Sequence, residues 1–389
     1  MYHSTFTQWI IKNKRIFVRA DLNVTLNDTI ITNEFRLKSI LPTIDFILKQ
    51  EGSIVLATHI GRPIHKESNF STKILLPWFE KHGYSLIFIP DISTISTMKV
   101  TPRQIILLEN LRFFPGEKNG DPLFAKQLAS TADYYINDAF GTIHRSDCST
   151  SLLPYEFSEN KRSIGFLIEK ELRALNKLKD NPSHPFIAII GGGKVEDKIP
   201  LLHNLLKNID ALLLCPAICF SFLKSLGHET GQSLVNNSTL SLCKKIILEA
   251  EQRNVSLQFP LDYQVTHNSI NEKLSIVSAA QFSHNLIGIS IGPKTVEYFS
   301  KEINNAKTIL FNCAMGFSDR PETRQSAKDI IDAMTKSSAE TVVAGGDSID
   351  IALSTKNYRS ISHLSSGGGA ALAYLSDIPL PGLAPFEEY

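Results

Sequence analysis

Short runs of Ile, Val and Leu without polar alternation recur along this chain, and longer amphipathic segments separate them. Strands that are covered by helices on both faces of a parallel sheet have this pattern. The runs lie at 15–20, 53–60, 85–89, 104–110 and 133–138, and again at 186–190, 211–215, 308–312, 341–346 and 359–365. The pattern predicts an α/β protein with two sets of five strands.

A charged, periodic segment at 164–180 lies between the two sets of runs and ends before Asn181-Pro182, where proline disfavours a continuing helix. The 389 residues are about two to three times the commonest domain size. We therefore expect a first domain at 1–163, a connecting helix at 164–180 and a second domain at 181–376. Each domain should be a doubly wound parallel sheet.

The overall charge excludes a nucleic-acid or membrane-surface protein, because 40 Lys and Arg nearly balance 39 Asp and Glu. Any anion site must be built locally. The five cysteines form no CxxC pair, which favours a reducing cytoplasm, and the sequence predicts no signal peptide and no membrane span. Cys215 and Cys219 have helical spacing, but no His or second pair joins them, so we expect buried apolar cysteines and no metal site.

In open parallel sheets, ligands bind beyond the carboxyl ends of the strands, so the residues that follow each strand are the candidates for binding and catalysis. In the first half these loops are rich in arginine, which binds phosphate and carboxylate through two parallel hydrogen bonds. A single loop arginine is usually a solvated charge, but several on one rim predict a small, multiply anionic ligand. The polar residues on this rim are Asp21, Asn23, Arg36, His59, Arg62, Arg112 and Arg145.

The loops after the second set of strands are rich in glycine, at 191–193, 345–346 and 367–369. Glycine lets the backbone approach phosphate oxygens, although tight turns need glycine too. The chain lacks GxxxxGK[ST], GxGxxG and HRD with DFG, which excludes those nucleotide-binding classes. The motifs include no carboxylate placed beside a hydroxyl acceptor to act as a general base. A carboxylate acceptor is already ionised at pH 7 and needs no general base. The pattern therefore favours an acyl-phosphate reaction.

Nine ordered motifs resemble the phosphoglycerate kinase family, from about residue 14 to 382. They are RADLN (19–23), THIGRP (58–63), LLENLRFFPGE (107–117), NDAFGTIHR (137–145), GGGKVEDKI (191–199), LGHETGQSL (226–234), IGPKT (291–295), GGDS (345–348) and SSGGGA (365–370). The resemblance implies two Rossmann-like domains joined by a hinge helix, with the tail 377–389 packing back on the first domain. It implies a cytoplasmic, monomeric kinase of glycolysis and gluconeogenesis.

The reaction that the resemblance implies is reversible phosphoryl transfer between 1,3-bisphosphoglycerate and ADP, giving 3-phosphoglycerate and ATP, with domain closure. The enzyme would be a phosphotransferase with a carboxyl acceptor, using Mg²⁺. By motif, the seven polar rim residues would bind 3-phosphoglycerate. The residues assigned to catalysis are Arg36, Lys194, Gly368 and Gly369, and those assigned to the nucleotide are Gly192, Gly193, Lys198, Asn312, Asp319, Gly346, Asp347 and Ser348, with Asp347 also serving the metal.

Departures from the family gather on the nucleotide side. The family's GGGMA reads Cys215-Pro216-Ala217-Ile218-Cys219 here, and its WNGPMGVFE reads as residues 311–319, so that Asp319 replaces a glutamate. Side chains that replace glycine add volume where a base would lie. We therefore expect weaker adenine-nucleotide binding or poorer discrimination between purines. The alternative is a catalytically weak paralogue with altered nucleotide specificity or a binding or regulatory role.

Overall fold

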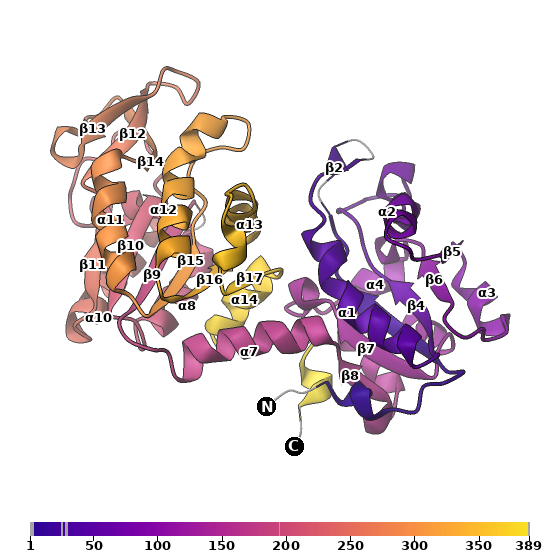
Figure 1. The fold of residues 1–389 in the computed structure, drawn as a ribbon. Coiled ribbons are helices and arrows are strands. Elements are labelled where there is room, and N and C mark those ends of the chain that lie inside the picture. The colour runs from indigo at the N-terminus through magenta and orange to yellow at the C-terminus, as the bar shows by residue number, and fades with distance from the viewer. Residues whose placement is uncertain (1–3, 25, 28–29, 194, 388–389) are drawn as a thin grey trace. The chain divides into compact units, whose positions relative to one another are not determined.

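The computed structural model describes residues 4–24, 26–27, 30–193 and 195–387 (Figure 1). Contacts within the chain divide it into unit 1, Met1–Arg173 with Pro379–Tyr389, and unit 2, Ala174–Ile378. The division falls inside helix α7 (Phe166–Asp180). Within the described residues, no helix combines the length and apolar character needed to span a membrane.

Unit 1 is built on a six-stranded sheet in the order β5-β6-β4-β1-β7-β8, and all of its neighbouring strands are parallel. These strands are β1 (Arg15–Ala20), β4 (Ser53–Ala57), β5 (Leu86–Ile89), β6 (Ile105–Leu108), β7 (Tyr134–Asp138) and β8 (Arg162–Ile164), and a separate antiparallel hairpin joins β2 (Leu26–Asn27) to β3 (Ile30–Ile31). The helices that precede α7 are α1 (Phe35–Lys49), α2 (Leu76–Lys81), α3 (Ile92–Thr97), α4 (Pro115–Asn119), α5 (Pro122–Ala129) and α6 (Cys148–Ser151).

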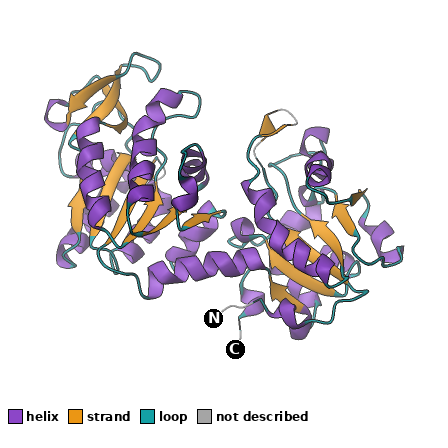
Figure 2. Ribbon diagram, viewed as in Figure 1, coloured by secondary structure: helices purple, strands orange, loops and turns teal. Residues whose placement is uncertain are grey.

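Both faces of this sheet are buried, as the apolar runs predict. Ile16 and Val18 of β1 pack in one buried cluster with Ile44 of α1, whereas Phe17 packs in a second cluster with Leu128 of α5. Successive side chains of a strand point to opposite faces, so β1 contributes to both clusters. Helices accordingly lie over both faces of the sheet (Figure 2).

Unit 2 contains a second six-stranded parallel sheet, in the order β11-β10-β9-β15-β16-β17. Its strands are β9 (Phe186–Gly192), β10 (Ala211–Ala217), β11 (Ser256–Gln258), β15 (Thr308–Asn312), β16 (Glu340–Ala344) and β17 (His363–Ser365). Its helices after α7 are α8 (Val195–Leu205), α9 (Ile218–Ser225), α10 (Leu240–Gln252), α11 (Pro293–Asn305), α12 (Gln325–Lys336), α13 (Gly346–Leu353) and α14 (Gly368–Leu375). The α/β class with two parallel sheets is confirmed.

The prediction of five strands per sheet is wrong by one strand in each. Strands β8 and β11 have only three residues, too few to form an apolar run. The predicted run at 359–365 is a strand only over His363–Ser365. A three-stranded antiparallel sheet in unit 2 was also missed; it is made of β12 (Asp262–His267), β13 (Ser275–Ser278) and β14 (Leu286–Ile291), whose polar and partly exposed residues break the apolar pattern.

The C-terminal segment of unit 1 packs against β7 and the loop that follows it. The Gly382 amide donates to the Ile143 carbonyl at 2.8 Å, and the Asn137 side chain donates to the Gly382 carbonyl at 3.2 Å. The Phe386 ring stacks on Tyr135 with a centroid distance of 6.3 Å. These contacts join the end of the chain to the sheet that carries the arginine-rich loops.

The buried carboxylate of Asp138, the last residue of β7, caps the start of α7. It accepts hydrogen bonds from the Thr43 hydroxyl at 2.6 Å and from the Ile168 amide at 3.1 Å. Gly165 is required beside it, because a Cβ there would lie 2.2 Å from the carboxyl carbon. Burial raises the pKa of Asp138 to about 7, although these hydrogen bonds act in the opposite direction.

We expect Asp138 to make the folded state less stable as pH rises. Its pKa is about 7 in the folded chain against 3.8 ordinarily, so the folded state holds this proton more tightly. The stability that the proton contributes is complete below pH 4 and is lost as pH rises through 7, by up to about 4 kcal/mol. The free energy of unfolding, measured in urea between pH 4 and 8, should change with pH more steeply in the parent than in Asp138→Asn. The exposed Asp45→Asn control should follow the parent, and parallel curves for Asp138→Asn would contradict this expectation.

Candidate active site

The arginine-rich loops of unit 1 follow β1, β4, β6 and β7 at one edge of the sheet. Asp21 comes directly after β1, and its buried carboxylate pairs with the Arg36 guanidinium at the start of α1. Asn23 accepts a hydrogen bond from the Gly61 amide at 2.8 Å, which ties the β1 loop to the β4 loop. The strand order therefore brings together side chains that are far apart in the sequence.

His59, directly after β4, is the centre of this group of arginines. It is 2% exposed, and its pKa lies well below the usual value because of burial and because Arg19, Arg112, Arg145 and Arg36 all act on it. Among these arginines, Arg19 contacts the ring directly, with Nη2 at 3.3 Å from His59 Nδ1. The imidazole is neutral at pH 7, and the positive charge of the site comes from the arginines.

Two of the converging arginines are held loosely. Arg112 lies 3.5 Å from the Asp147 carboxylate, and its buried Nε has no hydrogen-bond partner among the described residues. Arg145 donates from Nε to the His144 ring at 3.4 Å. Arg62 is exposed to solvent. Donors held this weakly can reorient toward an incoming anion at little cost, because no strong hydrogen bond must first be broken.

In unit 2, the glycine loop after β9 leads into α8, whose Lys198 turns back toward the end of the sheet. Its ammonium donates to the Gly191 carbonyl and, at 2.9 Å, to the Asn312 side chain. Gly192 has φ of 100°, a conformation that favours glycine. Lys194 lies outside the described residues.

The loop after β16 is tied to the end of β15. The Asn312 side chain donates to the Ala344 carbonyl at 2.7 Å, and the Cys313 amide donates to the Ser348 hydroxyl at 3.0 Å. Gly345 has φ of 106°, so a glycine is needed at this turn. Asn312 and Ser348 are buried and brace the loop through these bonds, while Asp319 is exposed.

Helices α13 and α14 begin side by side. A Cβ on Gly368 would lie 2.9 Å from the Gly345 Cα and 3.3 Å from the Gly346 amide nitrogen, so the two loops touch through bare backbone. The Asp347 side chain, in the first turn of α13, is 66% exposed, and its carboxylate lies 3.7 Å from the Arg324 guanidinium. Exposed backbone amides and an exposed carboxylate at two helix starts suit a phosphate group and a hard cation.

We expect Gly368→Ala to destabilise unit 2 by about 1 to 3 kcal/mol, because the added methyl group presses on backbone that cannot rotate away. ADP affinity should fall about tenfold as the two helix starts separate. Urea unfolding and calorimetry would measure the two effects. Gly346→Ala is the control for stability, since nothing lies within 4 Å of the added Cβ. Equal unfolding midpoints for the two variants would contradict the close packing.

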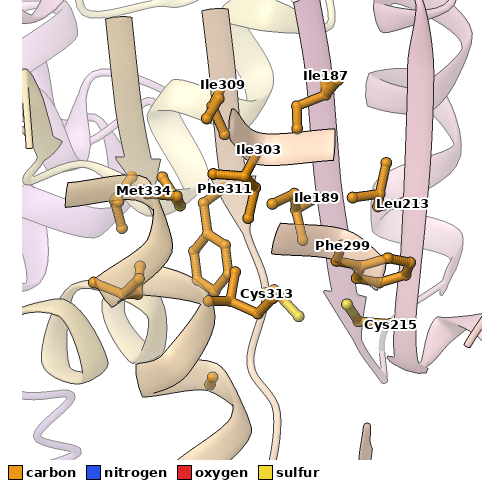
Figure 3. Packing of buried hydrophobic residues seen from close by; sticks show 14 of the residues in the cluster. Ile187, Ile189, Leu213, Cys215, Phe299, Ile303, Ile309, Phe311, Cys313 and Met334 are labelled. Carbon is orange, nitrogen blue, oxygen red and sulfur yellow. The ribbon is translucent and has the colours of Figure 1, made fainter. Parts of the chain in front are cut away.

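Cys215 and Cys313, two of the departures from the family pattern, place their side chains in the core of unit 2. Both are fully buried and pack with Phe299 and Phe311 in the main core cluster of unit 2 (Figure 3). A Cβ on Gly191 would lie 2.2 Å from the Cys313 sulfur, so the cysteines fill space over that glycine. The side chains of these two cysteines therefore belong to the core of unit 2.

The expectation of apolar cysteines in place of a metal site is confirmed for burial, because all five cysteines are free and buried. The described residues contain no cluster of three or more potential metal-ligating His, Cys, Asp or Glu side chains. Desolvation raises the pKa of the Cys215 and Cys219 thiols well above the usual value, so both remain protonated.

Three residues near these loops were missed by the sequence reasoning. Arg19 lies inside β1 and contacts His59, and Arg324 faces Asp347. Leu234 is 62% exposed, and its Cδ2 lies 2.7 Å from the position that a Cβ on Gly193 would take. The position of Arg19 inside an apolar run marks it as buried, whereas no local signal connects Arg324 or Leu234 to the loops.

Comparisons with known proteins agree with this arrangement. A family model described as phosphoglycerate kinase matches residues 6–377. Phosphoglycerate kinase of Finegoldia magna is 35% identical, with all of both chains covered, and that of Solibacter usitatus is 37% identical, with 97% of each covered. The structure of phosphoglycerate kinase from Coxiella burnetii superposes with a TM-score of 0.85 and 31% identity, covering 98% of this chain and 97% of that one. The chain therefore belongs to the phosphoglycerate kinase family.

Proposed function

We propose that this chain catalyses the glycolytic phosphoryl transfer between 1,3-bisphosphoglycerate and ADP, with 3-phosphoglycerate bound by unit 1 and the nucleotide by unit 2. The observation that carries the assignment of unit 1 is the group of arginines around the ends of its parallel strands, where Arg19 contacts His59 and Arg36 pairs with Asp21. Such a site suits a small ligand with both a phosphate and a carboxylate group, because guanidinium groups match the geometry of each.

On the substrate side, we assign binding of 3-phosphoglycerate to the residues of the arginine rim. The exposed Arg62 and the weakly held Arg112 and Arg145 would bind its phosphate group. The buried Asp21, with Asn23, would bind the hydroxyl and position Arg36 beside the carboxylate. The set is Asp21, Asn23, Arg36, His59, Arg62, Arg112 and Arg145.

On the nucleotide side, the glycine loops would bind the phosphates through backbone amides, and Lys198 would neutralise their charge. Gly368 and Gly369, at the start of α14, would stabilise the phosphoryl group during transfer, together with Arg36 and Lys194. Asn312 and Ser348 would hold the loops in place, as their hydrogen bonds support. Asp319 would contact the ribose.

Asp347 fits a role in holding Mg²⁺, because its carboxylate is exposed at 66% and offers the oxygen ligand that this ion prefers. Magnesium usually keeps several waters and takes one or two carboxylates together with substrate phosphates, so one protein ligand is sufficient. The ion would neutralise phosphate charge when bound. The ion pair between Arg324 and Asp347, at 3.7 Å, would have to break when the carboxylate binds the ion.

The transfer needs no protein base. An oxygen of the ionised 1-carboxylate attacks the γ-phosphorus of ATP, and the bond from that phosphorus to the β–γ bridging oxygen breaks as ADP leaves. No proton moves, because the carboxylate is already ionised at pH 7. The residues of this chain therefore act by positioning and by charge stabilisation, which is the usual basis of phosphoryl-transfer catalysis.

The proposal includes closure of the two units during the reaction, since each substrate is assigned to a different unit and water must be excluded from the transfer. It also includes a cytoplasmic, monomeric enzyme whose partners are small molecules and neither nucleic acid nor membrane. The net charge of +1 supports the absence of nucleic-acid and membrane partners, because it creates no overall attraction to either polyanion.

A coupled assay with 1,3-bisphosphoglycerate and either ADP or GDP tests this function. Sustained ATP formation that depends on Mg²⁺ is the expected result. Binding of 3-phosphoglycerate without turnover on either diphosphate would instead identify the weak paralogue. The ratio of ADP to GDP turnover measures the base preference, for which the departures at 215–219 and 311–319 predict weaker adenine binding or poorer discrimination between purines.

A further inference from the structure

Arg19 is a buried charge in the middle of β1, and its guanidinium is held on more than one side. The side chain is completely buried. Nε donates to the Ser149 hydroxyl at 2.7 Å, and Nη2 lies 3.3 Å from His59 Nδ1 and 3.9 Å from a Glu117 carboxylate oxygen. Because both Nε and Nη2 of this buried guanidinium contact partners, the group has little freedom to rotate.

The partners of Arg19 are themselves fixed. The buried Glu117 carboxylate accepts from the Ser149 hydroxyl at 2.6 Å and from the Ser149 amide at 2.9 Å. The serine hydroxyl therefore donates to Glu117 and can only accept from Arg19. In this network, the donor and the acceptor of each hydrogen bond between Glu117, Ser149 and Arg19 are therefore defined.

The chemistry of the guanidinium decides where His59 carries its proton. Arginine has five N–H donors and no acceptor, and it stays protonated in proteins. His59 Nδ1 must therefore be the acceptor in its contact with Arg19, and the proton of the neutral ring must be on Nε2. A doubly protonated ring would place one N–H against another and add a charge among four arginines.

We infer that Arg19 is a positioning residue that locks His59 as the neutral Nε2–H tautomer, so that the ring offers 3-phosphoglycerate an uncharged hydrogen-bond donor. The identity of the ligand rests on the proposed function. The arginines supply the charge of the site, and His59 supplies a donor of fixed direction.

This assignment has a consequence for pH dependence. The charged groups that face His59 are Arg19 of β1, Arg36 of α1, and Arg112 and Arg145 from the loops after β6 and β7. All remain cationic near neutral pH, and the pKa of His59 is depressed. Affinity for 3-phosphoglycerate between pH 6 and 8 should then follow the ionisation of the ligand's own phosphate, with no additional gain from a histidine cation as pH falls.

Nitrogen-15 NMR of the histidine-labelled, ligand-free full chain tests the inference directly. The His59 signals are assigned from their absence in His59→Gln. At pH 7 the expected spectrum has a protonated Nε2 and an unprotonated Nδ1, and the Nε2–H resonance should shift when 3-phosphoglycerate is added. A proton on Nδ1, or on both nitrogens, would overturn the tautomer assignment. The correct tautomer without a ligand-induced shift would overturn the substrate contact.

Variants of Arg19 separate positioning from simple packing. Arg19→Gln keeps an N–H donor without the charge, and Arg19→Met keeps the volume without the donor. The expected result is a mixed tautomer and a KM for 3-phosphoglycerate raised about tenfold in Arg19→Met, with most of this loss recovered in Arg19→Gln. Equal tautomer populations in both variants would contradict the inference. Combining each change with Glu117→Gln removes the buried unpaired carboxylate that would otherwise favour unfolding.

Loss of turnover in the coupled assay would count against the proposed function but not against the tautomer, which is measured without substrate. His59→Gln and His59→Leu complete the test. If an uncharged donor is what the ligand needs, His59→Leu should lose tenfold or more in 3-phosphoglycerate affinity, and His59→Gln should lose clearly less. Equal losses would exclude the donor role.

Discussion

We expect Arg36→Met to lower kcat by 100-fold or more, because the guanidinium is proposed to stabilise the charge that develops on the transferring phosphoryl group. Steady-state kinetics in both directions measure the effect. Lys38→Met is the matched control on the same helix, since Lys38 forms only a surface pair with Glu34 and is 59% exposed. Its kcat should stay within about twofold of the parent.

Arg36→Met also leaves the buried Asp21 carboxylate without the guanidinium that pairs with it, and an uncompensated buried charge costs about 3 to 5 kcal/mol. The double variant with Asp21→Asn removes that charge and should recover stability in urea unfolding. Its kcat should remain as low as that of the single variant. Recovery of turnover together with stability would show that Arg36 serves only the fold.

Replacing Arg62 with Ala weakens 3-phosphoglycerate binding by about 2 to 4 kcal/mol, because a charge-assisted contact to an anion is lost. This is about 30-fold to 1,000-fold in Kd. Calorimetry with 3-phosphoglycerate and, separately, with ADP would measure it. ADP affinity should not change, and Lys66→Ala, an exposed cation on the same loop, should bind both ligands as the parent does. An equal loss of both ligands in Arg62→Ala would contradict the assignment of ligands to separate units.

The parallel sheets could be predicted from the sequence because their strands are buried on both faces. Every residue of β1, β4 and β15 is buried, and each of these strands contains at least three consecutive apolar residues. The antiparallel strands β12–β14 were missed because β12 and β13 mix polar with apolar residues, and Gly288 and Ser290 interrupt the apolar residues of β14. Such strands depend on partners that are remote in the sequence, and local composition records them poorly.

The loops of the site could be predicted from strand ends, and the sequence also predicted that Cys215 would be a buried apolar residue. Cys215 packs in the same core cluster as Leu213 of β10, and Cys313, the residue after β15, packs in that cluster with Phe311. Because a strand repeats every two residues, counting back from either cysteine already indicates the core. Arg19 was overlooked, since a charge inside an apolar run has no meaning until its partners, Glu117 and His59, are placed by the fold.

Hydrogen–deuterium exchange of the full chain with each ligand alone tests most directly where the two substrates bind. With 3-phosphoglycerate, we predict protection confined to unit 1, in peptides that cover 19–23, 58–63, 107–117 and 137–145. With MgADP, we predict protection in unit 2, in peptides that cover 191–199, 312–319, 345–348 and 365–370. Amides that gain hydrogen bonds to a ligand, or lie in a loop that it orders, exchange more slowly. Protection of the glycine loops by 3-phosphoglycerate, or of the arginine loops by MgADP, would contradict the account.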